Sequence, residues 1–208
     1  MSKRMKAILN ENDFSQSQSL DSAVDTAIKT STTKFNETID ICLNLNIDPK
    51  NGEQNVRGKM KLPKGLGKKV TVCVFASEDK QQEAKDAGAD IVGGDEFIEK
   101  IKGGELNFEK LICTPGMMIK LSKLGKVLGP KGLMPNPKLG SVSENIKEAV
   151  TNAKSGQVEI RNDKDGNIGV SIGKKSFHDD ELLKNFHAVL DALEKEKSNN
   201  TLKGDLIK

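Results

Sequence analysis

The chain has 208 residues, and its 33 Lys and Arg nearly balance its 30 Asp and Glu, so the formal net charge is +3. This length allows one or two domains. The mixture of opposite charges with 35% hydrophobic residues excludes a disordered chain. Seven Phe, without Trp or Tyr, exclude RNA-binding modules that stack several bases on aromatic rings. No apolar run reaches the roughly 18 residues of a membrane span, and we expect no membrane partner.

Three cysteines, Cys42, Cys73 and Cys113, lie among apolar residues and cannot all pair with one another. We expect three reduced thiols in the protein core, as in a cytosol-like compartment; a metal or redox site is the alternative. The two histidines, His178 and His187, are nine residues apart, which is not a zinc-ligand spacing. We therefore expect no metal and no cofactor.

In chain order, a polar segment over residues 1–18 comes first. The first predicted helix follows Ser19, a favourable N-cap residue, and carries apolar residues between positions 20 and 28. Apolar and polar residues alternate over 39–47 and again over 56–62, which predicts two strands. Turn-forming residues separate the two strands, so we expect them to form an antiparallel pair.

The pattern changes between residues 64 and 155 to alternating strands and helices. The run 70–76 is almost continuously apolar, which is typical of a strand covered on both faces. A capping box at Ser141–Glu144 predicts a helix that runs to Lys154 and ends at Gly156. The other strands are predicted at 90–92 and 110–114, and the other helices at 78–87, 96–102 and 117–127. This alternation predicts a small parallel α/β sheet.

Strand patterns return after residue 156. Segments 158–161 and 168–172 flank residues 162–167, which contain Asp165-Gly166 and predict a hairpin turn. A helix capped by residues 176–179 has an apolar stripe from Leu182 to Leu193, and residues 202–208 resemble the beginning of a strand. We therefore expect an α/β protein in which residues 1–63 and 156–208 form one discontinuous domain and residues 64–155 an inserted one.

Two long segments contain basic residues and no acid: residues 57–69 hold six Lys or Arg, and residues 116–140 hold five Lys. Acidic residues are concentrated elsewhere, notably on the last helix. Such segregation creates a local positive field that phosphates feel, so nucleic acid is the favoured partner. Lysines solvated on ordinary protein faces are the alternative.

Catalytic and nucleotide-binding motifs fail on their spacing or on their structural context. Gly65–Lys69 lacks the first Gly and the final Ser or Thr of a phosphate-binding loop, and it precedes a strand rather than a helix. Ser171 lies in a Gly-x-Ser-x-Gly sequence, but within a predicted strand and not on the sharp turn that exposes a nucleophile. We expect no enzyme. The alternative, a small α/β nucleotide-binding or hydrolytic protein, rests on the alternation over 64–155 alone.

Residues 124–140 contain three Pro and four Gly, which excludes a continuous helix or a central strand. The segment is predicted to be an ordered basic loop that presents Lys126, Lys131 and Lys138. Its second part, Gly129–Gly140, resembles the signature of the ribosomal protein L1 family of the large subunit. Further motifs of the same bacterial or organellar type lie at residues 34–38, 46–49, 54–58, 62–68, 87–94 and 154–159.

The resemblance implies an α+β domain I, built from both chain ends, that binds the large-subunit rRNA of the mobile stalk. It also implies an inserted, Rossmann-like domain II that faces tRNA at the exit site and assists its release. Repression of the protein's own mRNA is a further implied activity. The protein would be a monomer within the cytoplasmic ribosome of a bacterium or an organellar ribosome. A free RNA-binding repressor outside the ribosome is the alternative. Family members usually continue beyond Lys208 into a full strand. Here the sequence stops, so we expect either a naturally short protein that lacks this strand or a truncated sequence.

The same resemblance implies which residues face RNA. RNA helices display 2′-hydroxyls and phosphates in a shallow groove and are read largely by shape, which suits short polar groups on a rigid strand edge. One Phe can pack on a ribose, although a core position for Phe35 is the alternative. The implied residues are Lys34, Phe35, Glu37 and Thr38 at the first strand, and Arg161, Asp163, Lys164 and Gly166 at the hairpin turn.

Overall fold

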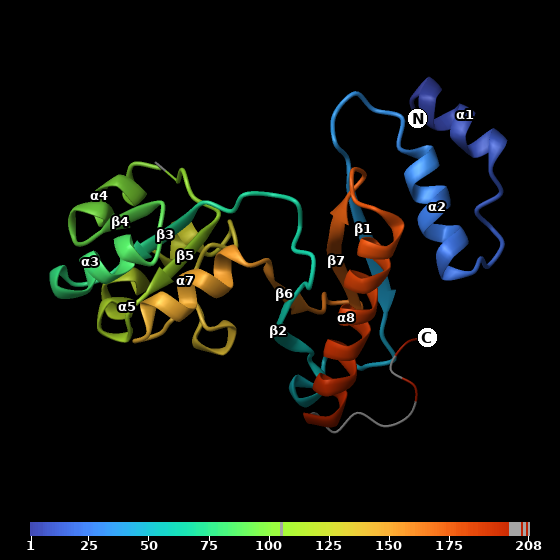
Figure 1. Cartoon of the computed structure of the whole chain (residues 1–208). Coiled ribbons are helices and arrows are strands. Elements are labelled where there is room, and N and C mark those ends of the chain that lie inside the picture. Colours follow the sequence, from blue (N-terminus) through green and yellow to red (C-terminus); the bar gives the residue numbers. More distant parts are fainter. Residues whose placement is uncertain (105, 200–204, 206, 208) are drawn as a thin grey trace.

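A computed structural model describes residues 1–104, 106–199, 205 and 207. Helices and strands are both abundant, which confirms the α/β class, and they gather in two lobes linked by two chain segments (Figure 1). One lobe, called here the split lobe, contains elements from both ends of the chain. The other, called the inserted lobe, contains the elements between residues 70 and 154.

Two antiparallel ribbons form the sheet structure of the split lobe. Strand β1 (Thr38–Asn44) pairs with β7 (Asn167–Lys174), and β2 (Arg57–Lys61) pairs with β6 (Gln157–Arg161). The prediction that the first two strands pair with each other is therefore wrong. Alternation of apolar residues identifies a strand but not its partner, and here a short helix, η1 (Gly52–Gln54), separates β1 from β2.

The predicted hairpin turn between β6 and β7 is present, but the strands separate directly after it. The backbone N–H of Asp163 donates to the carbonyl of Asn167 at 2.8 Å. Asn162 and Ile168 form an isolated antiparallel bridge, and from there β6 and β7 continue with different partners. The turn thus links two ribbons.

Helices α2 (Leu20–Thr30) and α8 (Asp179–Asn199) pack with these ribbons around one core. The predicted helix over 20–28 is confirmed, with Ser19 as its N-cap. Helix α8 buries Leu182, Val189 and Leu193 along one stripe, as its spacing predicts.

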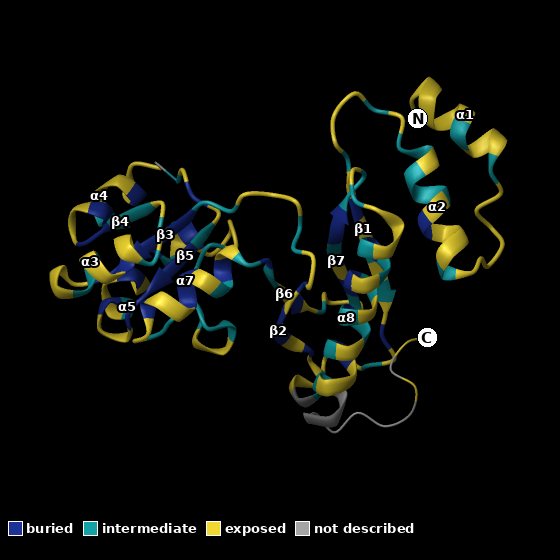
Figure 2. Cartoon of the chain, in the orientation of Figure 1, coloured by how far each residue is buried: buried dark blue, intermediate teal, exposed yellow. Residues whose placement is uncertain are grey.

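A three-stranded parallel sheet forms the centre of the inserted lobe, as predicted, and its strand order is β4-β3-β5. All four residues of the central strand are buried, and Figure 2 shows the buried residues concentrated along β3 and β5. The strands are β3 (Val72–Phe75), β4 (Ile91–Gly93) and β5 (Lys110–Cys113).

Helices cover both faces of this sheet, because two separate apolar clusters lie against β3 and β5. One cluster includes residues of α4 (Glu96–Lys102) and α5 (Pro115–Ser122), and the other includes residues of α3 (Glu78–Asp86) and α7 (Ile146–Lys154). The predicted helix over 117–127 is two helices, α5 and the short α6 (Gly125–Leu128).

The N-terminus of α7 differs from the prediction. The helix begins at Ile146, and Asn145 is its N-cap: its side-chain oxygen accepts from the backbone N–H of Glu148 at 3.2 Å. The Asn145 amide also donates to the Glu148 carboxylate. The Ser141 hydroxyl, predicted as the cap, instead bonds to the backbone of Asn136. Asn145 and Glu148 thus bond to each other in both directions, four residues after the capping box that the prediction placed at Ser141–Glu144.

Three further differences concern single segments. A helix that the sequence pattern did not predict, α1 (Lys3–Glu11), precedes α2 and contains no buried residue. Cys73 and Cys113 are buried, but Cys42 is exposed, because strand alternation places it on the solvent side with Asp40. The predicted C-terminal strand falls mostly outside the described residues; Ile207 forms an antiparallel bridge with Leu45.

No helix among the described residues is long and apolar enough to cross a membrane.

Asn185 of α8 connects the split lobe to the first segment that leads toward the inserted lobe. It is fully buried, and its oxygen accepts from the backbone N–H of Lys64 at 3.1 Å. Its amide donates to the carbonyls of Gly65 at 3.0 Å and Ile172 at 2.7 Å. Asn185 therefore fixes the start of the linker against both α8 and β7.

We predict that Asn185→Ala lowers the free energy of unfolding by about 3 kcal/mol, because it leaves buried backbone groups without partners. Urea denaturation of the whole protein measures this difference. The matched control is Lys184→Ala, at the exposed preceding position of the same helix; equal losses in the two variants would contradict the assigned role.

Candidate nucleic-acid interface

One predicted group of residues lies where β1 begins and β7 ends, and we call residues 34–38 with 174–176 the strand-end patch. The Asn36 amide donates to the Ser176 hydroxyl at 2.9 Å, and the Asn36 oxygen accepts from the backbone N–H of Ser176 at 3.2 Å. Lys174 Nζ donates to the Thr38 hydroxyl at 2.6 Å. These bonds brace the loop before β1 against the end of β7.

Phe35 projects from this braced segment with 69% of its surface exposed. The alternative of a core position for Phe35 is therefore wrong. Lys34 beside it is exposed as well. The exposed ring of Phe35 and the exposed ammonium group of Lys34 are thus neighbours on a segment that hydrogen bonds fix to the end of β7.

Glu37 is half-buried and stabilises the loop before β1 through its carboxylate. Its carboxylate accepts from the backbone N–H of Thr33 at 3.4 Å and from the Arg4 guanidinium at 3.5 Å. Burial raises the pKa of Glu37, but hydrogen bonds from Thr33, Ser31 and Arg4 outweigh it, so the pKa is lowered. The carboxylate remains ionised at neutral pH and ties helix α1 to the patch.

The second predicted group is the turn patch, residues 161–166. Arg161 and Lys164 are exposed. The Asp163 carboxylate, by contrast, accepts from the backbone N–H groups of Asp165 and Asn167, each at 2.8 Å. Gly166 is buried with φ of +82°, a conformation that suits Gly. Asp163 and Gly166 thus form the turn, and the two basic side chains extend from it.

The structure does not bring the two groups into one compact site. In the β1–β7 ribbon, Thr38 lies opposite Lys174 and Asn44 lies opposite Asn167, so the two patches stand at opposite ends. At about 3.4 Å per residue along the strand, they are roughly 20 Å apart.

Several residues of the two acid-free segments pair with acids that are distant in sequence. Arg57 lies 3.3 Å from Glu159, and Lys68 lies 2.5 Å from Glu109. Other pairs are Lys64–Glu181 and Lys120–Asp95. Local segregation of charge in the sequence therefore overstates the positive field of the folded protein.

The basic loop over 124–140 keeps its charges exposed. Lys126, Lys131 and Lys138 are exposed, and among the described residues no carboxylate lies within 4.0 Å of their ammonium groups. Asn136 orders the loop, because its backbone N–H donates to Ser141 at 2.7 Å and its side chain accepts from the backbone N–H of Lys138 at 2.9 Å. The predicted basic segment is present and ordered, but it is not a loop throughout, because Lys126 lies on helix α6 and Lys138 on a short 3-10 helix, η2 (Pro137–Leu139).

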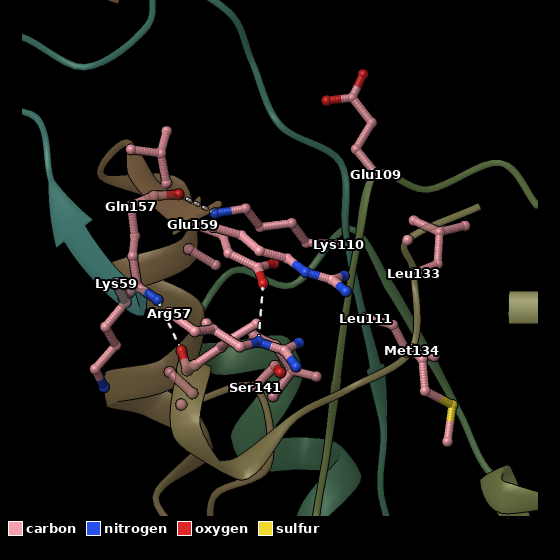
Figure 3. A pocket seen from close by; sticks show the side chains of 18 of the residues that line it. Arg57, Lys59, Glu109, Lys110, Leu111, Leu133, Met134, Ser141, Gln157 and Glu159 are labelled. Atoms are coloured by element: carbon pink, nitrogen blue, oxygen red, sulfur yellow. Dashed lines mark hydrogen bonds and ion pairs between the residues drawn. The ribbon is translucent and has the colours of Figure 1, made fainter. Parts of the chain in front are cut away.

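A crevice of about 330 Å³ lies between the β2–β6 ribbon and the inserted lobe. Figure 3 shows Leu133 and Met134 on the opposite side from Gln157 and Lys59. Lys110 Nζ reaches across it and donates to the carbonyl of Gln157. Burial lowers the pKa of Lys110, because desolvation disfavours the charged ammonium form.

The architecture and the motifs agree with one protein family. A family model described as ribosomal protein L1p/L10e matches residues 27–208. The chain belongs to the ribosomal protein L1p/L10e family. The large ribosomal subunit protein uL1 of Pelagibacter ubique (strain HTCC1062) is 69% identical over 207 residues, which cover 100% of this chain and 90% of that protein.

Membership of the L1p/L10e family confirms several expectations. Its members are structural, non-enzymatic proteins of the large ribosomal subunit, so the prediction of a non-enzymatic ribosomal protein is confirmed. The bacterial relative agrees with the expected location in a cytoplasmic ribosome.

Sequence reasoning about this L1-family chain missed some residues of the candidate interface. Asn36, Lys174 and Ser176 form the brace of the strand-end patch. Arg57, which was predicted only as part of the basic segment 57–69, lines the crevice. A correct pairing of β1 with β7 would have identified Lys174, which lies opposite Thr38. Arg4, which contacts Glu37, gave no signal because the helix that carries it was not predicted.

The turn patch supplies a pH-dependent prediction. Backbone hydrogen bonds from Asn167 and Asp165 lower the pKa of Asp163 below its ordinary value of 3.8. A carboxyl group with a lowered pKa in the folded state stabilises the fold above its unfolded pKa, and the contribution disappears as the pH falls through the folded pKa.

We therefore expect Asp163→Asn to be less stable than the wild type at neutral pH and to lose less stability between about pH 5 and pH 2. Denaturation in urea at several pH values measures both effects. The neighbouring exposed Asp165 provides the control Asp165→Asn. The role of Asp163 is wrong if both variants keep the pH dependence of the wild type.

Proposed function

We propose that this protein binds a folded segment of large-subunit rRNA through the strand-end patch and the turn patch. Residues 1–63 with 156–208 act as the rRNA-binding domain I, and residues 64–155 act as the inserted domain II. Separate apolar cores in the split and inserted lobes support this division. The name of the relative supports a place in the large subunit.

The exposed Phe35 is the observation that carries the proposal. Exposing a large ring to water is unfavourable unless the ring contacts a partner, and Phe35 is held out by a hydrogen-bonded loop. Packing on a ribose would cover the ring, and Lys34 would contact an adjacent phosphate. Thr38 offers a hydroxyl to 2′-OH groups, and Glu37 fixes the loop through Thr33 and Arg4.

Arg161 and Lys164 of the turn patch provide the second contact. Two contacts about 20 Å apart on one rigid ribbon would fix the orientation of an RNA helix, since shape and phosphate spacing are what double-stranded RNA presents. Asp163 and Gly166 act by shaping the turn.

Domain II has a separate role in this proposal. Its basic loop, with Lys126, Lys131 and Lys138, faces tRNA at the exit site and assists its release. The monomeric protein also binds a structure in its own mRNA through domain I and represses its translation. Because rRNA and mRNA would use the same surface, each should exclude the other.

The double variant Lys34→Ala/Phe35→Ala is expected to bind the rRNA stalk fragment at least tenfold more weakly, since ring packing and phosphate contacts each contribute about 1 kcal/mol or more. Fluorescence anisotropy with a labelled fragment at a fixed salt concentration measures the affinity. The matched control is Phe14→Ala/Lys85→Ala, which removes another exposed ring and another exposed lysine. Equal affinity of the site variant and the wild type would refute the strand-end patch.

The alternative is a free RNA-binding repressor, which would be found outside the ribosome and not bound to large subunits. We expect the protein to co-sediment with large subunits in a sucrose gradient and to leave them as the salt concentration rises, since phosphate contacts are sensitive to salt. Recovery in the soluble fraction alone, at low salt, would favour the free repressor.

A further inference from the structure

Arginine is rare in this chain, and two of its residues lie side by side. The 33 basic residues include three arginines, Arg4, Arg57 and Arg161. Arg57 and Arg161 are directly opposite each other in the β2–β6 ribbon. Like charges directly opposite each other across two strands destabilise the pair. This placement is therefore unfavourable for the fold alone.

The ribbon carries an excess of positive charge on one face. Gly58, Met60 and Ile160 are buried, so the alternate residues point to the other side. These are Arg57, Lys59, Lys61, Gln157, Glu159 and Arg161. Glu159 is the one acid among them, and it pairs with Arg57 at 3.3 Å. Among the described residues, no carboxylate lies within 4.0 Å of the Arg161 guanidinium.

Both arginines line the crevice of about 330 Å³ together with Lys59 and Lys110 (Figure 3). Two carboxylates also line it, but Glu109 pairs with Lys68 and Glu159 with Arg57. The crevice therefore holds unneutralised positive charge. A cavity with low-dielectric walls focuses such a field and attracts anions.

A second hollow on the surface shares the same two arginines. It is lined by Arg57, Arg161, Asn162, Asp163 and Lys164, with Pro49, Asn55 and Val56. Cationic side chains thus continue from Lys164 of the turn patch, past the two arginines, to the crevice. An extended polyanion fits this arrangement better than a single small anion, because the charges span two adjoining hollows.

We propose that Arg57 and Arg161 form a clamp for the phosphodiester backbone of an RNA strand that passes from the turn patch into the crevice. The planar guanidinium fork matches phosphate oxygens in a bidentate way that an ammonium group does not. A bound phosphate relieves the repulsion between the two arginines. The clamp rests on the proposed function, because it extends the RNA contact of the turn patch to Arg57, Lys59 and Lys110.

The experiment measures binding of the full-length protein to the rRNA stalk fragment by anisotropy over a range of salt concentrations. The variant Arg57→Gln/Glu159→Gln removes the Arg57 guanidinium without changing the net charge. The variant Arg161→Gln removes the second guanidinium of the clamp. Each is expected to weaken binding by about five- to fiftyfold, and their combination, which releases the shared phosphate, is expected to lower the salt slope by about 0.7–0.9. Because both forks would hold the same phosphate, the combined variant should lose less than the product of the separate losses.

Each control variant makes the same change in charge as one of the arginine variants, but at a position outside the crevice. Lys120→Gln/Asp95→Asn removes an ion pair of 2.7 Å in the inserted lobe, and Lys85→Gln removes an exposed cation. Both should bind as the wild type does. Arg57→Lys/Glu159→Gln keeps a positive charge without the fork and should still bind more weakly than the wild type.

Two outcomes would overturn the clamp. Wild-type affinity of both arginine variants, together with a loss in Lys34→Ala/Phe35→Ala, would refute the clamp and leave the proposed function intact. Tight binding of AMP that depends on Arg57 and Arg161 would assign the crevice to a small nucleotide instead of an RNA strand. If the wild type does not bind the fragment at all, the proposed function itself fails.

Discussion

The structure depends on the close approach of the two segments that connect the lobes. Lys61 of β2 lies opposite Gln157 of β6, and the backbone N–H of Leu62 donates to the carbonyl of Gly156 at 3.3 Å. Gly156 has φ of +85°, and a Cβ at this position would lie 2.7 Å from the Cα of Gly65. A larger residue there would push apart the outgoing and returning chains, which hold the ribbon, the crevice and Arg57 in place.

Local elements of this fold were largely predictable from the sequence, and their pairing was not. The apolar run of β3 and its flanking helices identified a parallel sheet, because burial on both faces leaves a clear pattern. The alternation in β1 identified a strand, but its partner β7 lies more than a hundred residues later. Helix α1 was missed because its segment is mostly polar and none of its residues is fully buried.

In the candidate site, too, the residue types were predictable from the sequence, and the tertiary contacts around them were not. Motifs indicated Phe35 and Lys164, yet exposure of the Phe35 ring depends on Asn36 and Ser176, which meet through tertiary structure. The acid-free segment 57–69 predicted a positive surface, but acids from distant elements neutralise part of it. Residue type and local pattern thus identify candidates, and the register of the ribbons decides which of them are free to bind.

The opposed arginines give salt two contrary effects on this protein. Ions screen the repulsion between exposed charges over about 10 Å at moderate ionic strength, so added salt relieves the strain that Arg57 and Arg161 place on the β2–β6 ribbon. The same ions compete with the side chains for phosphate. In the proposed clamp, the repulsion between the two arginines is therefore weakest under the conditions in which the hold on a polyanion weakens, and a bound phosphate chain takes the neutralising role that salt has in free solution.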